Sequence, residues 1–378
     1  MTAQCKRTRF EEFDIGRAIA ILGLPMVHVL EEADSIDLLP HGFMNAHLFL
    51  LALSALGAPL FMACMGANMV FTRHAAPREL AKRGVLLLVT GVLLNIARYA
   101  APDIIFGHLP GATYTGDWLI YTLMPDIYDF SGGCFLAFAL FKKLDLSPCK
   151  ILVIAAVCLV TGAYLLPVFF ADPNINNLTC FMGRFFWVNE NSCFPLLTWL
   201  IFPALGYAFG HWFKNAQTDQ ARWAGLCRMM PVAAAVFAAT AIYVVVTGGD
   251  LMLAYASPAN SYITDIPNVA LVSSTLVFVA ALVHKLALAL KETRALLWLV
   301  RTSKGIIPYY TCQWVVIGWA EYFIHDLHLE PYTQLNELNF WLFSLAVVAT
   351  SLWFSRFWMS FKASRSSRMA ASGTVTRS

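Results

Sequence analysis

The feature that most constrains this chain is a succession of apolar runs, each close to the length that crosses a lipid bilayer. About 20 apolar residues span the hydrocarbon layer as an α-helix, which satisfies every backbone polar group internally. No run shows the alternation of a transmembrane β-barrel strand. The sequence therefore predicts an all-α, polytopic membrane protein with about ten transmembrane helices. The predicted spans are residues 15–31, 46–71, 84–101, 119–141, 150–171, 195–213, 228–247, 268–290, 306–324 and 338–359.

The composition excludes a soluble protein of this size. Hydrophobic residues make up 59% of the 378 residues and charged residues 13%, and the mean hydropathy is +0.63. A soluble domain carries about 25% charged residues. The net charge of +3 comes without a basic cluster interleaved with aromatics, so no nucleic-acid partner is expected. No CxxC or histidine-rich spacing occurs, so no metal site is predicted.

The positions of lysine and arginine predict the orientation in the membrane. All of the 26 Lys and Arg residues except Arg98 and Arg184 lie in the two tails, in the even-to-odd connections or in the adjoining span ends. Cytoplasmic loops carry an excess of these residues, so both termini are predicted to be cytoplasmic. Residues 1–361 are expected to form one integral-membrane domain and residues 362–378 a disordered cytoplasmic tail.

The long external connection at 172–194 contains two cysteines, Cys180 and Cys193. An external compartment is oxidising, which favours a loop-closing disulfide. Two free thiols are the equally weighted alternative.

Ionisable residues inside the first span mark the strongest candidate site. Arg17 and His28 are eleven helical steps apart, about 1100° of rotation, so they lie on nearly one face and about 16 Å apart along the axis. Ionisable groups at such depth are energetically costly and usually functional. The pair predicts a site that holds a long ligand near Arg17 and does chemistry at His28.

Two carboxylates follow the histidine at helical spacing. Glu31 and Glu32 stand three and four residues after His28, where either can reach the imidazole and orient it as a general base. These three residues form the predicted catalytic group. The alternative is a histidine that hydrogen-bonds between helices and serves packing alone.

Further cations are expected at the cytoplasmic mouth of this face. Arg73, Lys82 and Arg83 follow the second span and, with Arg17, are predicted to bind the phosphate groups of a ligand. For the three loop residues, the positive-inside rule alone is a sufficient explanation.

A second polar group lies within or at the edges of later spans and is predicted to contact the substrate. Asp126 and Asp129, three residues apart, are expected to share a helix face. Arg98 is the predicted counter-charge for these carboxylates, and Gln313 completes the group. Two membrane carboxylates also suit the proton or cation site of a transporter.

Several stretches resemble one family. Residues 9–21 (RFEEFDIGRAIAI), with ten residues between Arg17 and His28, resemble the N-terminal signature of the integral-membrane acyltransferases. These comprise acyltransferase family 3 and the heparan-α-glucosaminide N-acetyltransferase-like proteins. Residues 58–66 (APLFMACMG), 125–132 (PDIYDFSG) and 305–313 (GIIPYYTCQ) are similar to later family segments.

The resemblance implies transfer of an acyl group, usually acetyl, from cytoplasmic acyl-CoA to a sugar-type acceptor. It makes Arg17 and His28 the matching pair, with His28 catalytic. In the heparan-type branch the active histidine precedes the second span, where this chain has His41 and His47, so His47 is the alternative base. Gln313 stands where many relatives have a histidine.

Residues and resemblance together predict a membrane acyltransferase in the lipid bilayer of a bacterial inner membrane. Its expected donor is acyl-CoA, with acetyl-CoA favoured, and its expected acceptor is a hydroxyl or amine of a glycan. A transporter or flippase of a small or lipid-linked glycan is the alternative. The lack of a convincing repeat between the two halves of the sequence counts against that alternative.

Overall fold

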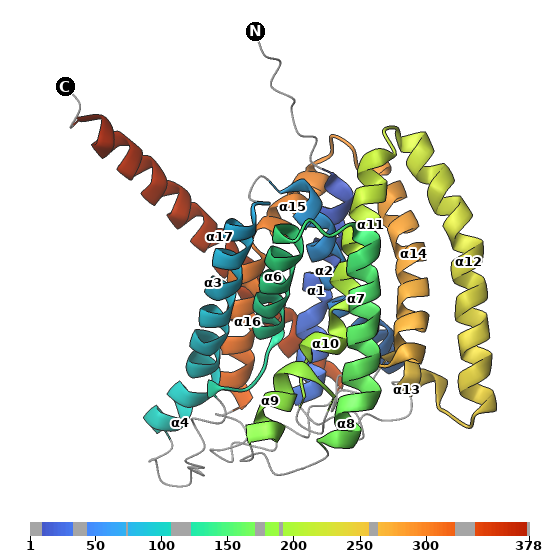
Figure 1. The fold of residues 1–378 in the computed structure, drawn as a ribbon. Coiled ribbons are helices and arrows are strands. Elements are labelled where there is room, and N and C mark those ends of the chain that lie inside the picture. The colour runs from blue at the N-terminus through green and yellow to red at the C-terminus, as the bar shows by residue number, and fades with distance from the viewer. Residues whose placement is uncertain are drawn as a thin grey trace.

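The structure is a computed structural model that describes residues 10–32, 44–72, 75–106, 122–170, 178–188, 192–256, 264–321 and 337–375. Every regular element in these ranges is helical, and the helices form one bundle (Figure 1). The elements are α1 (Glu11–Glu32), α2 (Met44–Phe71), α3 (Pro77–Asn95), the π-helical turn η2 (Ile96–Ala100), α4 (Ala101–Phe106), α6 (Ile127–Lys143), α7 (Pro148–Val160), the π-helical turn η3 (Thr161–Leu165), α8 (Leu166–Phe169), α9 (Leu178–Phe186), α10 (Leu196–Trp199), α11 (Ile201–Asn215), α12 (Asp219–Val246), α13 (Leu251–Ala256), α14 (Ile266–Ala289), α15 (Arg294–Lys304), α16 (Ile306–Glu321) and α17 (Glu337–Val375).

Every one of the ten predicted spans overlaps a helix of the bundle. Within the described ranges, six helical stretches are long and apolar enough to cross a membrane, which makes this a multi-pass membrane protein. The count of ten stays a prediction. The six stretches are Pro77–Ile105, Pro148–Phe169, Leu196–Asn215, Asp219–Val246, Ile266–Ala289 and Asn339–Arg365.

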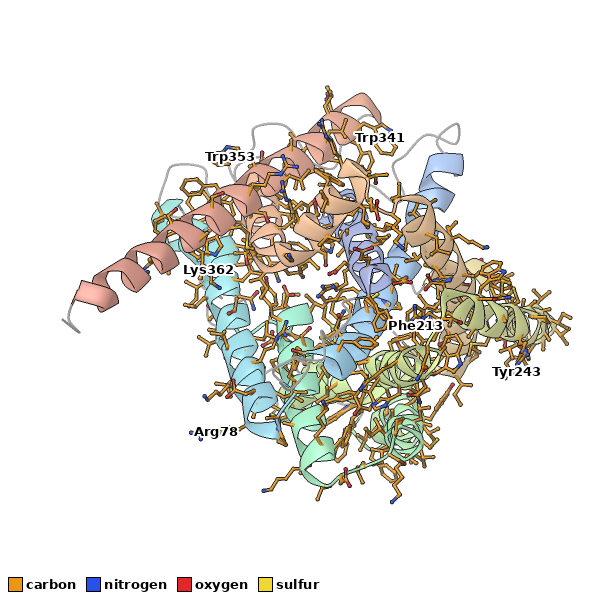
Figure 2. All side chains as sticks on the ribbon, turned by 90° about the horizontal axis from the view of Figure 1, so that it is seen from above. Arg78, Phe213, Tyr243, Trp341, Trp353 and Lys362 are labelled. Atoms are coloured by element: carbon orange, nitrogen blue, oxygen red, sulfur yellow. The ribbon has the colours of Figure 1, made fainter. Side chains whose placement is uncertain are left out.

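The outer surface of the bundle is apolar. On α12, Val246 is 80% exposed and Tyr243 is 58% exposed, and on α17 Trp353 is 65% exposed. Figure 2 shows Tyr243 and Trp353 at the rim of the bundle, pointing outward. A soluble monomer rarely exposes so much contiguous apolar surface, whereas lipid tails cover such side chains without cost.

The helix ends sort into two layers. The start of α1, the ends of α2, α6 and α11, and the starts of α3, α7 and α12 lie at one end of the bundle, together with α15 (Figure 1). The short helices α4, α8, α9 and α13 lie at the opposite end. The first layer holds the connections that are rich in lysine and arginine, so the positive-inside rule assigns it to the cytoplasm. That side remains a prediction.

The fourth span begins later than predicted. The sequence predicted a helix from residue 119, but α6 begins at Ile127 because Asp126 is its N-cap, with extended backbone (φ −138°, ψ 171°). The backbone N–H of Asp126 donates to Oδ2 of Asp129 at 3.0 Å, one half of a capping box. Asp126 therefore lies before the first turn of α6, whereas the spacing had predicted that Asp126 and Asp129 both lie within a helix and share one face.

The C-terminal segment is helical in the structure to Val375, whereas a disordered tail was expected from residue 362. Alanine and arginine, frequent in this segment, favour helix. Extension of a helix that has already formed also costs far less than nucleation of a new one.

The amphipathic helix α15 was not predicted, because it is too short and too polar to read as a span. Thr293 caps it, with Oγ1 accepting from the backbone N–H of Leu296 at 3.2 Å. The helix buries Leu296 and exposes Leu297 and Trp298. Ser303 and Lys304, in its last turn, line the cavity described below.

Helices α2 and α11 cross at unusually close range. A Cβ atom added at Gly66 would overlap the carbonyl oxygen of Pro203, and one added at Gly206 would overlap that of Ala63. Small residues at such positions let two helix backbones approach closely in a membrane.

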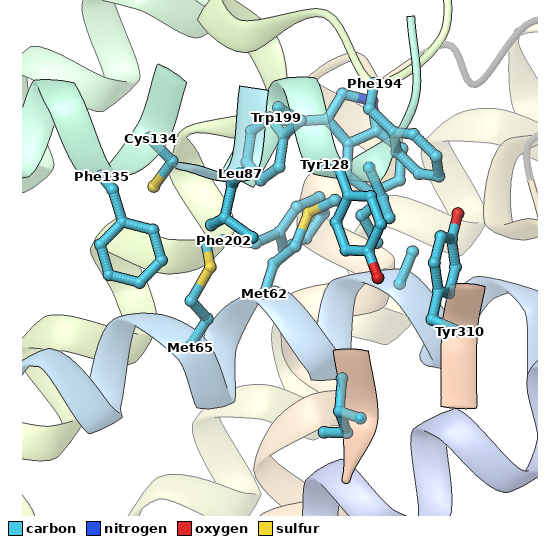
Figure 3. Close-up of a cluster of buried hydrophobic side chains, with 14 of the residues drawn as sticks. Met62, Met65, Leu87, Tyr128, Cys134, Phe135, Phe194, Trp199, Phe202 and Tyr310 are labelled. Carbon is cyan, nitrogen blue, oxygen red and sulfur yellow. The ribbon is translucent and has the colours of Figure 1, made fainter. Parts of the chain in front are cut away.

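This close crossing fixes the face of α2 that supplies the core. Met62 and Met65 project from α2 toward Phe202 and Phe135, beside the tyrosine Tyr128 (Figure 3). Because methionine side chains fill irregular gaps, the core here depends on the position of the α2 backbone.

Substitution of Gly66 by alanine is therefore expected to destabilise the protein by about 3 kcal/mol, the upper end of the usual overpacking cost. The obstacle is backbone, which cannot rotate away as a side chain can. Thermal unfolding in detergent measures the effect. The matched control is Gly133→Ala, whose Cβ would meet a side-chain atom, Leu196 Cδ2, at 3.1 Å. Equal unfolding temperatures for the two variants would contradict the assignment of this crossing.

Candidate active site

A cavity of about 590 Å³ extends into the bundle beside α1. Its walls come from α1, α2, α3, α6, α15 and α16. Polar side chains gather where α1 begins, and apolar side chains with two tyrosines line the deeper part. The polar lining residues of the mouth are Asp14, Arg17, Asn68, Thr72, Arg83, Ser303 and Lys304.

Arg17 is held in place at this mouth by a buried carboxylate. Its Nη2 donates to Oδ1 of Asp14 at 2.7 Å, and Ser303 Oγ donates to the same oxygen at 2.7 Å. Asp14 is only 3% exposed, so its charge needs these partners. Arg17 Nε is buried and has no hydrogen-bond partner among the residues that the structure describes.

The other predicted cations of the mouth divide into two kinds. Arg83 lines the cavity, with its guanidinium carbon 4.7 Å from the ring centre of Phe135. Lys82 does not line the cavity: it is exposed on α3 and pairs with Glu79 at 3.4 Å. Arg73 lies outside the described residues. Lys304, which the sequence did not single out, lines the mouth instead.

Two tyrosines close the inner end of the cavity. Tyr128 donates its hydroxyl to the backbone carbonyl of Ile307 at 3.0 Å and lies 3.1 Å from Thr311 Oγ1. Tyr310 donates to Oδ1 of Asp126 at 2.7 Å. The two rings are 5.1 Å apart at their centres (Figure 3). Both hydroxyls form hydrogen bonds, and the two rings lie between the cavity and the residues behind it.

Behind Tyr310 lies a closed set of contacts that we call the inner polar cluster. Nδ1 of His28 is 3.0 Å from Nε2 of Gln313, and the indole of Trp314 stacks on the imidazole with ring centres 4.2 Å apart. The edge of the imidazole meets Tyr310 at 6.0 Å between ring centres. The cluster consists of His28, Arg98, Asp126, Tyr310, Gln313 and Trp314, each at most 7% exposed.

An ion pair completes the cluster. Arg98 Nη2 is 3.2 Å from Oδ2 of Asp126, and its guanidinium carbon lies 4.3 Å from the ring centres of both Tyr99 and Trp314. The counter-charge predicted for Asp126 is thus confirmed. Because both groups are buried, each needs the other to remain charged.

Local backbone features hold the ion pair in position. Arg98 lies in the π-helical turn η2, and such turns are frequent at functional sites. Trp319 Nε1 donates to the carbonyl of Ala97 in this turn at 2.8 Å. On the other side, Asn95 Nδ2 donates to the carbonyl of Met124 at 2.7 Å, which fixes the segment that leads to Asp126.

The structure brings most of the predicted inner residues together, but the contacts of Asp129 and Gln313 differ from those predicted. His28, Arg98, Asp126 and Gln313 all lie in the inner polar cluster, while Asp129 serves the N-cap of α6. Gln313 contacts the histidine rather than only the substrate region. The side chains of the three remaining predicted catalytic residues fall outside the described part of the chain, and their roles stay predictions. These residues are Glu31, Glu32 and His47.

The aromatic members of the site were missed. Tyr310 and Trp314 flank Gln313 in the same span, and Tyr128 lies between Asp126 and Asp129. Their spacing around a polar membrane residue was the available signal. Within the described ranges, no group of three or more His, Cys, Asp and Glu side chains is arranged to hold a metal ion.

Comparison with known proteins gives one match. A family model described as heparan-alpha-glucosaminide N-acetyltransferase, catalytic, matches residues 9–247, more than half of the chain. Of the two branches that the sequence resembles, the match is to the heparan-type branch. No curated protein and no solved structure matches the chain.

Proposed function

The chain belongs to the family of heparan-alpha-glucosaminide N-acetyltransferase catalytic domains, and from this premise we propose that it is a membrane acetyltransferase. The proposed reaction moves an acetyl group from acetyl-CoA to a hydroxyl or amine of a glycan acceptor. The observation that carries the proposal is the cavity beside α1, which is cationic at its mouth and ends at the tyrosine that touches His28.

The cavity suits a long ligand with phosphates at one end. Arg17, Arg83 and Lys304 are placed at the mouth, where guanidinium and ammonium groups bind phosphate oxygens. Ile21 and Leu24 of α1 line the deeper wall, which fits the less polar pantetheine arm. A volume of about 590 Å³ is within the range of small-molecule sites, about 300–1,000 Å³. The rise of about 16 Å from Arg17 to His28 sets the reach that the donor needs.

His28 is the proposed general base. Its Nε2 accepts the proton of the acceptor hydroxyl or amine as that oxygen or nitrogen attacks the thioester carbonyl carbon. The carbon–sulfur bond then breaks, and the proton passes from His28 to the departing CoA sulfur. This step requires the ring of Tyr310 to shift, because that ring separates the cavity from His28 in the structure. Arg98 and Asp126 are proposed to hold the acceptor by hydrogen bonds, and their fixed ion pair supplies both a donor and an acceptor.

The proposed direction of entry follows from the layers of the bundle. The donor enters at the end that contains α15, which the positive-inside rule assigns to the cytoplasm. The acceptor approaches the inner polar cluster from the opposite side. A bacterial inner membrane is the proposed location.

Purified protein is expected to be stabilised thermally by CoA, since a ligand that binds only the folded state raises the unfolding temperature. Arg17→Ala is expected to raise the Kd for CoA about 10- to 100-fold, because a hydrogen bond to a charged group contributes about 1.5–3 kcal/mol. A titration of unfolding temperature against CoA concentration measures both effects.

Lys82→Ala is the matched control, because this cation is exposed and lies outside the cavity. Its titration should overlay that of the wild type. Equal losses of affinity in the two variants would indicate a general effect of charge. They would contradict the proposal that CoA binds in this cavity. Absence of any response to CoA in the wild type, with no acetyl transfer, would overturn the proposed function in favour of glycan transport.

A further inference from the structure

We propose that Gln313 is the positioning residue for His28: its amide holds the Nδ1 edge of the imidazole, so that Nε2 is the nitrogen that exchanges protons with the reactants. The inference rests on the proposed function, in which His28 is the base. It assigns to Gln313 the orienting role that spacing had predicted for Glu31 and Glu32.

Two contacts fix the orientation of the imidazole. The stack of Trp314 on the ring, 25° from parallel with centres 4.2 Å apart, defines the plane of the ring. The 3.0 Å contact between Gln313 and Nδ1 then defines the rotation within that plane. Gln313 is 0% exposed and His28 is 5% exposed, so water cannot readily substitute for the amide.

The hydrogen-bonding capacity of the amide decides which ring nitrogen carries the proton. As placed, Nε2 of Gln313 faces the ring, and Oε1 is buried without a hydrogen-bond partner in the described part of the chain. The oxygen and nitrogen of an amide exchange places by a half-turn and differ little in shape. After that half-turn, Oε1 accepts the Nδ1–H of His28.

A general base requires this second arrangement. Nδ1 is occupied by Gln313, so the free lone pair must be at Nε2, and the proton of the neutral ring must then be on Nδ1. An Nδ1–H needs an acceptor, which Oε1 provides. The imidazolium formed during the reaction keeps the same Nδ1–H, so the contact serves both states of the ring.

A neutral acceptor also has a different effect from a carboxylate. Glutamine orients the ring without adding a negative charge that would stabilise the imidazolium. The proton taken from the acceptor is therefore passed on more readily to the departing sulfur. The charges of the neighbouring Arg98 and Asp126 already compensate each other at 3.2 Å, so Gln313 leaves the cluster electrically balanced.

Steady-state kinetics of two variants test the proposal. Gln313→Met has similar length but no hydrogen bond, and kcat is expected to fall about 100-fold, as for other residues that orient a functional histidine. The KM for acetyl-CoA should stay within about twofold, because the donor mouth is untouched. Gln313→Glu keeps an acceptor for Nδ1–H and should recover much of kcat. Its added charge should move the acidic limb of the pH–rate profile to higher pH.

The matched control is Ser344→Ala. Ser344 is also fully buried, on the neighbouring helix α17, and its hydroxyl has no hydrogen-bond partner among the described residues. Removal of this buried polar group should leave kcat and the pH–rate profile unchanged. A loss of kcat equal to that of Gln313→Met would make the effect one of general packing and overturn the proposal.

Nitrogen NMR of protein labelled in histidine gives a readout independent of turnover. Signals that disappear in His28→Gln identify the ring. The expected wild-type spectrum has a protonated Nδ1 and an unprotonated Nε2, with a mixture of tautomers in Gln313→Met. A proton mainly on Nε2 would overturn the inference.

The assays separate the two levels of the proposal. If the wild type releases no CoA, the proposed function fails, and the positioning role of Gln313 fails with it. If the wild type turns over while Gln313→Met matches its kcat and its tautomer, only the role of Gln313 fails.

Discussion

Replacement of His28 by alanine is expected to reduce acetyl transfer about 10²- to 10⁴-fold, the usual contribution of a positioned general base. The imidazole is the group in the inner polar cluster that can take a proton from an acceptor and return it to the leaving sulfur. Affinity for CoA should be unchanged, because His28 does not line the donor cavity. Transfer of label from radiolabelled acetyl-CoA, with membrane extract as the source of acceptor, measures the rate.

Two further histidine variants make this measurement decisive. His211→Ala is the control, since His211 lies near the end of α11 and packs its ring on Tyr207 at 4.7 Å, away from the inner polar cluster. It should transfer at the wild-type rate. His47→Ala tests the heparan-type alternative for the base. Loss of transfer in His47→Ala with full activity in His28→Ala would indicate that the base is His47, near the start of α2.

The second large effect is expected at the ion pair behind the cavity. Asp126→Asn should destabilise the protein by about 3–5 kcal/mol, because it removes the carboxylate that pairs with the buried guanidinium of Arg98. Asparagine is as good an N-cap as aspartate, so α6 should begin at the same residue. The loss therefore reports the buried carboxylate, which pairs with Arg98 and accepts from Tyr310, rather than the cap. Thermal unfolding in detergent, with CoA absent, gives the change in free energy of unfolding.

A double variant and a surface control complete this experiment. Arg98→Met combined with Asp126→Asn removes both charges and should recover most of the stability, a coupling that the double-mutant cycle quantifies. Asp219→Asn breaks the pair between Arg222 and the Asp219 carboxylate, whose side chain is 52% exposed, and should cost less than about 1 kcal/mol. A small cost for Asp126→Asn alone would mean that Arg98 has another adequate counter-charge.

The helices of the bundle were predictable from sequence because lipid imposes one strong rule on the chain. A run of apolar residues such as 228–247 has no other stable form in a membrane, and α12 covers it. The same rule does not predict polar helices that lie at the surface of the membrane. Helix α15 is capped by Thr293 and buries the side chain of Leu296. It contains no apolar run long enough to predict it from sequence.

The site could be predicted only where a single residue is unusual for the apolar run around it. His28 and Arg17 stand out because an ionisable group inside an apolar run needs a reason. The pairing of Arg98 with Asp126 followed from the need to neutralise a buried carboxylate. By contrast, the contact between Gln313 and His28 could not be predicted from spacing, because the two residues meet only after folding. The roles of Glu31 and Glu32 stay predictions.

Aromatic residues posed a different problem. Tyr310 and Trp314 fit equally well as ordinary core residues of a span, and nothing in their local sequence distinguishes them. Their roles follow from what each ring touches in three dimensions, namely the carboxylate of Asp126 and the imidazole of His28. Such contacts depend on how α16 packs against α1, which hydropathy does not determine.

The contribution of α16 also changes what the boundary of the family match means. The match ends at residue 247, yet Tyr310, Gln313 and Trp314 lie beyond it and touch the histidine within it. A fragment cut at that boundary would hold His28, the proposed base, without the groups that contact its imidazole. A substitution in α16 should accordingly be assessed as a change in the surroundings of the proposed base, although α16 lies outside the matched range.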